Sequence, residues 1–172
     1  YGLGTLGTTL ADGRKVTLQV ASDYPRDGHI KIKISPEKPS QFALRLRIPF
    51  WSAKTEVKVN GQAVKDAKPA QYLVLEREWK PGDTIELNLD FSLHYWVGER
   101  ESEGKVSIFR GPVLLTYDRR YNTMDPADVP SLDARGLQGN QSSQASWHQP
   151  IVKLDFPAEN GQKVTLCDFA SA

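Results

Sequence analysis

The chain has 172 residues, of which 39% are hydrophobic and 25% are charged, a composition that argues against disorder and against a fibrous protein. Lysine and arginine (22) nearly balance aspartate and glutamate (21), and no apolar stretch approaches the ~20 residues of a membrane span, so neither nucleic acid nor a membrane is an expected partner. The lone Cys167 excludes an internal disulfide and a metal site held by cysteines.

Apolar residues recur at every second position in successive segments, which is the period of a strand with one buried face. Three such runs lie in the first 50 residues, at 15–20, 30–34 and 42–48. In the third run Arg45 and Arg47 alternate with apolar residues, so a shift of one residue in strand pairing would bury two arginines. The pattern therefore predicts half-buried strands with a fixed register.

Two turn sequences predict how the next strands are connected. Asn60-Gly61 accepts the positive φ angles of a type I′ turn and predicts a tight hairpin. In Lys80-Pro81-Gly82-Asp83, proline presets the turn and glycine supplies its left-handed corner. The strands joined by these turns are expected at 57–59, 62–64, 73–75 and 85–89.

Beyond Asp90 the alternation is less regular, resuming within 106–115 and again after residue 150. Turn signals about every 10–15 residues, without an amphipathic helix, are typical of an antiparallel β-sandwich. We therefore predict an all-β, antiparallel β-sandwich protein with a long loop and closing strands near its C-terminus. The predicted parts are a sandwich domain at 1–118, a long loop or linker at 119–148, and closing strands of the same or a second, incomplete β-domain at 149–172.

The residues that could carry chemistry do not form a convincing catalytic or metal site. Glycoside hydrolysis needs two carboxyl groups whose different environments give them different pKa values. Neither the pair Glu76 and Glu78 nor the acidic run at 99–103 has apolar neighbours in the sequence that would raise the pKa of one member. Cys167 lies in an alternating run and is interpreted as a packing residue. The histidines lack the close spacing of helical zinc motifs: they are His29, His94 and His148. We expect no catalytic residue, metal ligand or cofactor in this chain.

The aromatic residues fall into two groups with different expected roles. Trp51 and Trp79 lie at the ends of predicted strands, where packing inside the sandwich is expected. The others lie outside regular alternation or beside basic residues, where an exposed ring could stack a sugar or dock a partner. For the tyrosines near residue 120, a half-buried surface edge is the alternative. The candidate carbohydrate or domain contact residues are Tyr95, Trp96, Trp147, His148, Tyr117 and Tyr121.

Several motifs occur in a characteristic order over residues 15–117, and together they resemble one known enzyme family. They are DYPRDG at 23–28, LRLRIPFW at 44–51, VKVNG at 57–61, LEREWKPGD at 75–83, and GKV at 104–106 followed by RGPV at 110–113. This series resembles the β-sandwich region C-terminal to the catalytic barrel in glycoside hydrolase family 127 (GH127), the β-L-arabinofuranosidase-type enzymes.

The resemblance implies a parent enzyme whose (α/α)6 barrel cleaves L-arabinofuranosyl or related linkages with a cysteine nucleophile and a zinc ion. No segment of this chain matches that cysteine and glutamate cluster, so the chain alone is expected to be inactive. The glycine-rich start and strand-like end indicate a fragment. The resemblance also implies a periplasmic or extracellular location.

Three functions are therefore compared. The first is a non-catalytic accessory sandwich that packs against the N-terminal catalytic barrel of the same polypeptide. The second is an independent carbohydrate-binding module with arabinose-containing glycans as ligands, which requires exposed aromatics on one sheet face. The third is a structural or adhesin-like module, which requires neither sugar affinity nor an apolar docking face.

Overall fold

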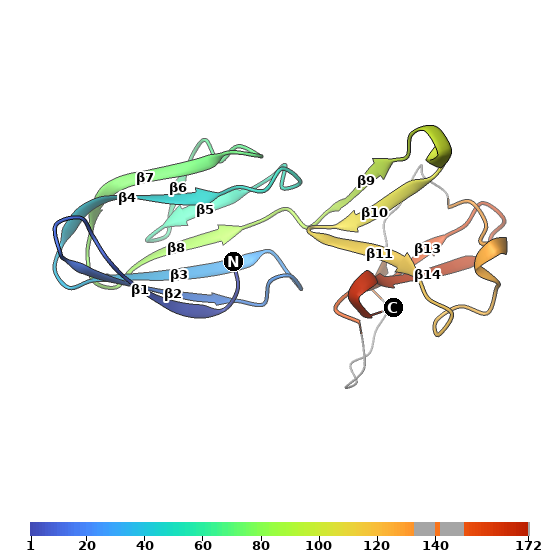
Figure 1. Ribbon diagram of the computed structural model, residues 1–172, viewed down its shortest axis with the longest axis horizontal. Coiled ribbons are helices and arrows are strands. Elements are labelled where there is room, and N and C mark those ends of the chain that lie inside the picture. The colour runs from blue at the N-terminus through green and yellow to red at the C-terminus, as the bar shows by residue number, and fades with distance from the viewer. Residues whose placement is uncertain (133–139, 142–149, 172) are drawn as a thin grey trace. The chain divides into compact units, whose positions relative to one another are not determined.

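The structure is a computed structural model that describes residues 1–132, 140–141 and 150–171. The described residues form antiparallel strands and three short 3-10 helices, without an α-helix among them, which confirms the predicted all-β class. The chain divides into two compact units, Tyr1–Phe91 and Ser92–Ala172 (Figure 1). Within the described residues, no helix has the length and apolarity needed to cross a membrane.

The first unit is a sandwich of two unequal layers. One layer has six strands in the order β1-β2-β3-β8-β5-β6, and the other pairs β4 with β7. Figure 1 shows β4 and β7 side by side as a layer of their own. The strands are β1 (Gly4–Thr9), β2 (Lys15–Ser22), β3 (His29–Pro36), β4 (Ser40–Arg47), β5 (Glu56–Val59), β6 (Gln62–Val64), β7 (Tyr72–Trp79) and β8 (Asp83–Asn88).

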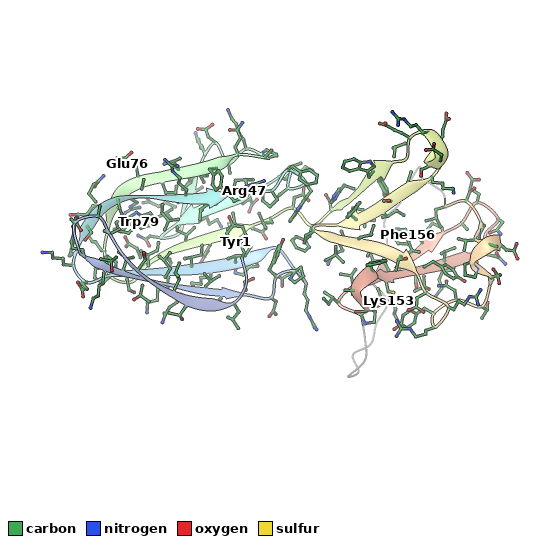
Figure 2. All side chains as sticks on the ribbon, viewed as in Figure 1. Tyr1, Arg47, Glu76, Trp79, Lys153 and Phe156 are labelled. Carbon is green, nitrogen blue, oxygen red and sulfur yellow. The ribbon has the colours of Figure 1, made fainter. Side chains whose placement is uncertain are left out.

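The core of this unit is built from the alternate residues that the sequence pattern predicted. On β3, for example, the isoleucines are buried and the lysines between them are exposed. Trp79 from β7 is fully buried between the layers, and its indole Nε1 donates to the Phe42 carbonyl at 3.1 Å (Figure 2). Trp51 is half-buried, with its ring centroid 5.4 Å from that of Phe91. Both tryptophans therefore have the packing role expected of them.

Both predicted turns are present. Asn60 and Gly61 have φ angles of 50° and 79°, as a type I′ turn requires, and they connect β5 to β6. Gly82 has a φ of 93°, and the Asp83 amide donates to the Lys80 carbonyl at 3.1 Å between β7 and β8. The β7–β8 turn passes from one layer to the other, with Trp79 buried before it and Ile85 buried after it.

The second unit contains one six-stranded sheet in the order β12-β13-β14-β11-β10-β9. One face of this sheet carries the buried apolar cluster, against which Met124, Val129 and Leu132 from the segment after β11 pack, and the central strand β14 is buried on both faces. An isolated bridge pairs Leu132 with Ala158. The elements are β9 (Leu93–Val97), η1 (Arg100–Ser102), β10 (Val106–Arg110), β11 (Val113–Tyr117), η2 (Pro126–Asp128), β12 (Asn140–Gln141), β13 (Lys153–Pro157), β14 (Lys163–Asp168) and η3 (Phe169–Ser171).

The domains predicted at 1–118, 119–148 and 149–172 remain a prediction, and the structure shows only which segments are compact. The compact units divide between Phe91 and Ser92, and β9–β11 share a sheet with the strands after residue 149. The pairing responsible is β11 with β14, in which Tyr117 lies opposite Leu166. A pairing across so long a segment leaves no trace in local periodicity. That each unit folds as an independent domain is a prediction taken up below.

Candidate functional site

The candidate site is the hairpin of β9 and β10 at one edge of the second unit's sheet (Figure 1). The two strands pair from Leu93 opposite Arg110 to Val97 opposite Val106, and the connecting turn contains η1. Ile108, which is 4% exposed, anchors the hairpin in the core. Toward the turn the apolar side chains are largely exposed: Tyr95 (41%), Trp96 (67%), Val97 (65%) and Val106 (51%).

These exposed side chains lie on both faces of the hairpin. Successive residues of a strand point to opposite faces. Tyr95 pairs with Ile108, and Val97 pairs with Val106, so these residues share the core-facing side of the sheet. Trp96 lies on the other side. This pattern is unusual, because sheets that face water normally show polar residues on the solvated side.

Trp96 shares its face with two further rings. His94 precedes it by two residues, and His94 lies opposite Phe109 on β10. The His94 and Phe109 rings are stacked, with their centroids 5.3 Å apart and an interplanar angle of 14°. Both are half-buried, so only Trp96 presents most of its ring to solvent. The three rings form an aromatic row on this face of the hairpin.

The other candidate aromatics are in different surroundings. The Tyr117 hydroxyl donates to the Met124 carbonyl, and its ring packs against the core of the second unit. The Tyr121 ring is close to two cations, with the Lys153 Nζ 4.9 Å and the Arg120 guanidinium carbon 5.5 Å from its centroid. Both tyrosines are half-buried by these contacts. Trp147 and His148 lie outside the described residues.

Cys167 is buried, as its position in an alternating run predicted. Its Sγ lies 3.8 Å from Asp118 Oδ2, and the thiol is fully shielded from solvent. Burial, reinforced by the negative charge of Asp118, raises the pKa of Cys167 to about 11. The thiol is therefore protonated at neutral pH, which is the reverse of what a nucleophilic cysteine requires.

The Asp118 carboxylate beside the Cys167 thiol also accepts hydrogen bonds from Arg120. Arg120 Nε donates to Asp118 Oδ2 at 2.7 Å, and the Arg120 amide donates to Oδ1 at 2.7 Å. The side-chain hydrogen bond from Arg120 lowers the pKa of Asp118 below its usual value. Asp118, Arg120 and Cys167 thus form a packing cluster held by a charged hydrogen bond.

The remaining candidates for chemistry are dispersed over the surface. Glu76 and Glu78 are exposed on β7, the acidic run at 99–103 is exposed in the hairpin turn, and His29 is exposed on β3. Within the part of the chain that the structure describes, no three histidine, cysteine, aspartate or glutamate residues are grouped so as to hold a metal ion.

A second exposed aromatic surface, on the outer face of β4 and β7, was missed by the sequence analysis. Arg47 lies opposite Tyr72, with its guanidinium carbon 5.7 Å from the Tyr72 ring centroid. Tyr72 is 59% exposed, and Val74, which lies opposite Arg45, is 50% exposed. Alternation placed the arginines on the solvated face, but the aromatic partner depends on the pairing of β4 with β7, which sequence reasoning did not predict.

Comparison with known proteins identifies relatives of this architecture. Residues 3–91 match the family model of the GH127 β-L-arabinofuranosidase middle domain. Among solved structures, the chain is similar to a glycoside hydrolase, with a TM-score of 0.79 and 25% identity over 99% of this chain and 32% of that one. None of the curated proteins compared with the chain matches it.

Two further solved structures share the fold. A GH127 β-L-arabinofuranosidase from Geobacillus stearothermophilus T6 has a TM-score of 0.83 and 21% identity, covering 97% of this chain and 30% of that one. A GH127 β-arabinofuranosidase has a TM-score of 0.79 and 21% identity, covering 97% of this chain and 31% of that one. The chain therefore spans about a third of the length of these structures.

The family match refines the resemblance drawn from the sequence. The similarity to GH127 is confirmed, but the model that matches describes the middle domain and covers almost all of the first unit. The motif DYPRDG at 23–28 and the motif LEREWKPGD at 75–83 both lie inside the match. These residues were expected to belong to a C-terminal region, whereas the family model that matches residues 3–91 describes a middle domain.

Proposed function

The chain belongs to the GH127 β-L-arabinofuranosidase family through its middle domain, and from this premise we propose that it is a non-catalytic accessory region of such an enzyme. In this proposal the chain packs against an (α/α)6 catalytic barrel that lies N-terminal in the same polypeptide. The second unit, which follows the middle domain, is the C-terminal β-region of that polypeptide. The similar solved chains are about three times as long as this one, which supports a larger parent protein.

The observation that carries this proposal is the exposed apolar surface on both faces of the β9–β10 hairpin. Trp96 and Val97 are adjacent residues that point to opposite faces, and each is about two-thirds exposed (67% and 65%). Burying aromatic and branched side chains of this size stabilises an interface by ~1.5–3 kcal/mol each. A neighbouring domain that encloses the hairpin would bury both faces at once.

Binding between this chain and the separately produced catalytic region of its parent enzyme tests the proposal. Isothermal titration calorimetry should detect association, and Trp96→Ala combined with Val97→Thr should weaken it by at least about tenfold. Tyr72→Ala is the matched control, because Tyr72 is a similarly exposed aromatic (59%) on the first unit. The absence of association, or equal weakening by the control, would refute the proposal.

Activity of the isolated chain provides an independent test. The chain should not hydrolyse an aryl β-L-arabinofuranoside, because its cysteine is buried and protonated at neutral pH. Hydrolysis that Cys167→Ala abolishes would show that the chain is itself an enzyme, whereas equal hydrolysis by both preparations would indicate a contaminant.

A second candidate function, direct contact with arabinose-containing glycans, rests on the aromatic row of Trp96, His94 and Phe109. Ligand sites combine apolar or aromatic surfaces with a few polar groups, and Ser107 lies opposite Trp96 on the neighbouring strand. Calorimetric titration with arabino-oligosaccharides should then give heat that Trp96→Ala abolishes. If no heat is detected at millimolar ligand, glycan binding is excluded, and the proposed docking role is unaffected.

A further inference from the structure

The first strand of the first unit has an open edge. Among the described residues β1 pairs with β2 alone, through six consecutive pairs from Gly4 opposite Val20 to Thr9 opposite Lys15. All six residues of β1 are exposed. The side of β1 that faces away from β2 therefore presents backbone N–H and C=O groups that another strand can pair with.

This edge lacks the features that usually prevent edge-to-edge association. Natural sheets protect their edges with charged side chains, prolines, bulges or very short strands. The other edges in this unit follow that rule: β6 has three residues, β4 carries Arg45 and Arg47, and β7 carries Glu76–Glu78. By contrast, β1 has the uncharged sequence GTLGTT, and its register with β2 is unbroken.

The side chains of β1 leave room for a close neighbour. A Cβ added at Gly4 or Gly7 would meet nothing within 4 Å. Glycine in a strand weakens it and often marks a place where another backbone approaches. Leu6 lies opposite Leu18, which packs against the core, yet Leu6 is 59% exposed. The core-facing side of the sheet is thus incompletely covered at this strand.

We propose that β1 pairs antiparallel with β1 of a second copy of this chain, joining two six-stranded layers into one continuous sheet. A twofold axis places each strand against its own sequence, so the contacting surface must be self-complementary. An uncharged strand satisfies this condition because no like charges meet. Pairing centred on Leu6 brings the two Leu6 side chains together on the core-facing side, where each covers the other.

The composition of the edge strands favours a second copy of this chain, and not a charged strand of another protein, as the partner of β1. Nothing on β1 offers an opposite charge to such a partner, since its residues are glycine, threonine and leucine. The same pairing through β4 or β7 would place arginines or glutamates near their own copies, which is destabilising. Of the longer edge strands in this unit, β1 is the one suited to pair with itself.

Sedimentation of the chain over a range of concentrations tests this interface. The unmodified chain should form a dimer, and Thr5→Lys should weaken it by at least about tenfold because each copy places a lysine at the edge. Gln19→Lys is the matched control, since Gln19 lies opposite Thr5 on the same face, one strand inward. It should dimerise like the unmodified chain, and circular dichroism should show that all three proteins are folded.

A cross-link fixes the register of the pairing. Leu6→Cys should form a disulfide-linked dimer on mild oxidation, while the buried Cys167 stays reduced. A chain that stays monomeric to about 1 mM, or a dimer unaffected by Thr5→Lys, would overturn the proposal. A dimer that Trp96→Ala abolishes would also overturn it, because the hairpin of the second unit would then be the interface.

Discussion

Asn60 and Asp83 join two turns that are 23 residues apart in the chain: Asn60 Nδ2 donates to Asp83 Oδ1 at 2.9 Å. Asn60 Oδ1 in turn accepts from the Thr84 amide at 2.8 Å, and Asp83 Oδ2 accepts from the Lys80 amide at 2.9 Å. The β5–β6 turn is thereby held against the β7–β8 turn. The two turns that the sequence identified separately form one hydrogen-bonded unit.

Removing the Asp83 carboxylate should destabilise the first unit. Asp83→Ala loses the acceptor of both the Asn60 and the Lys80 hydrogen bonds, and the free energy of unfolding should fall by about 1–2 kcal/mol. Urea unfolding followed by circular dichroism measures the change. Glu76→Ala, which removes an exposed carboxylate on β7 of the same unit, should change the stability by less than about 0.5 kcal/mol. Equal effects would show that the link between the turns adds nothing.

The same carboxylate should make stability depend on pH in a defined direction. Burial raises the pKa of Asp83, but hydrogen bonds from the Lys80 amide and the Asn60 side chain outweigh it, and the net pKa is lowered. A lowered pKa gives stability that is complete above the unfolded value of about 3.9 and is lost as the pH falls through the folded value. The stability difference between the unmodified chain and Asp83→Asn should therefore shrink below about pH 4. A difference that is constant from pH 7 to pH 3 would contradict this.

Truncation of Trp79 should destabilise the chain strongly, whereas truncation of Trp96 should change its stability very little. Trp79 is fully buried between the layers, so Trp79→Ala should cost about 3–5 kcal/mol in the free energy of unfolding or prevent folding of the first unit. Trp96 is 67% exposed, so Trp96→Ala should stay within about 0.5 kcal/mol. Chemical denaturation compares the two variants. A large loss of stability in Trp96→Ala would mean that the hairpin ring is covered within this chain.

The two units should unfold as separate domains. Each has its own buried cluster, so Phe156→Ala in the second unit should lower one unfolding transition and leave the other unchanged. Ile85→Ala provides the reciprocal change in the first unit. Differential scanning calorimetry resolves the two transitions. A single transition shifted equally by both variants would show that the units fold as one.

Cys167 should report on the unfolding of the second unit. Its thiol is fully buried, and burial raises its pKa to about 11, so an aromatic disulfide reagent should react slowly with the native protein near pH 8. The reaction rate should rise with urea in parallel with the unfolding of the second unit. Fast labelling without denaturant would place the thiol at the surface.

Local features of this fold were predictable from sequence, because they depend on a few adjacent residues. The Asn60-Gly61 hairpin needs two positive φ angles, and the alternation on β3 needs only the period of a strand. The burial of Trp79 followed from its position at the end of an alternating run. In each case the residues that make up the sequence pattern are also the residues that form the predicted structural feature.

Features that depend on distant pairing could not be predicted in the same way. The division after Phe91 results from β11 pairing with β14, and the exposed contact of Arg47 with Tyr72 results from β4 pairing with β7. The exposure of Trp96 depends on which segments cover the hairpin. Neither the residue type nor the residues adjacent to it in the sequence determine this. Candidate aromatics could therefore be named from sequence, while the contrast between exposed Trp96 and packed Tyr117 required the strand order.

The position of β14 between β11 and β13 sets the order in which the chain can fold as it is synthesised. The first unit has all of its strands once Asn88 has emerged from the ribosome. The second unit must wait for the residues of β14, because this late strand lies inside its sheet and not at the edge. Until then, β11 and β13 lack the partner that joins them. A truncation before Lys163 would accordingly leave the first unit intact and separate the second unit's sheet into the three strands β9–β11 and the pair β12–β13.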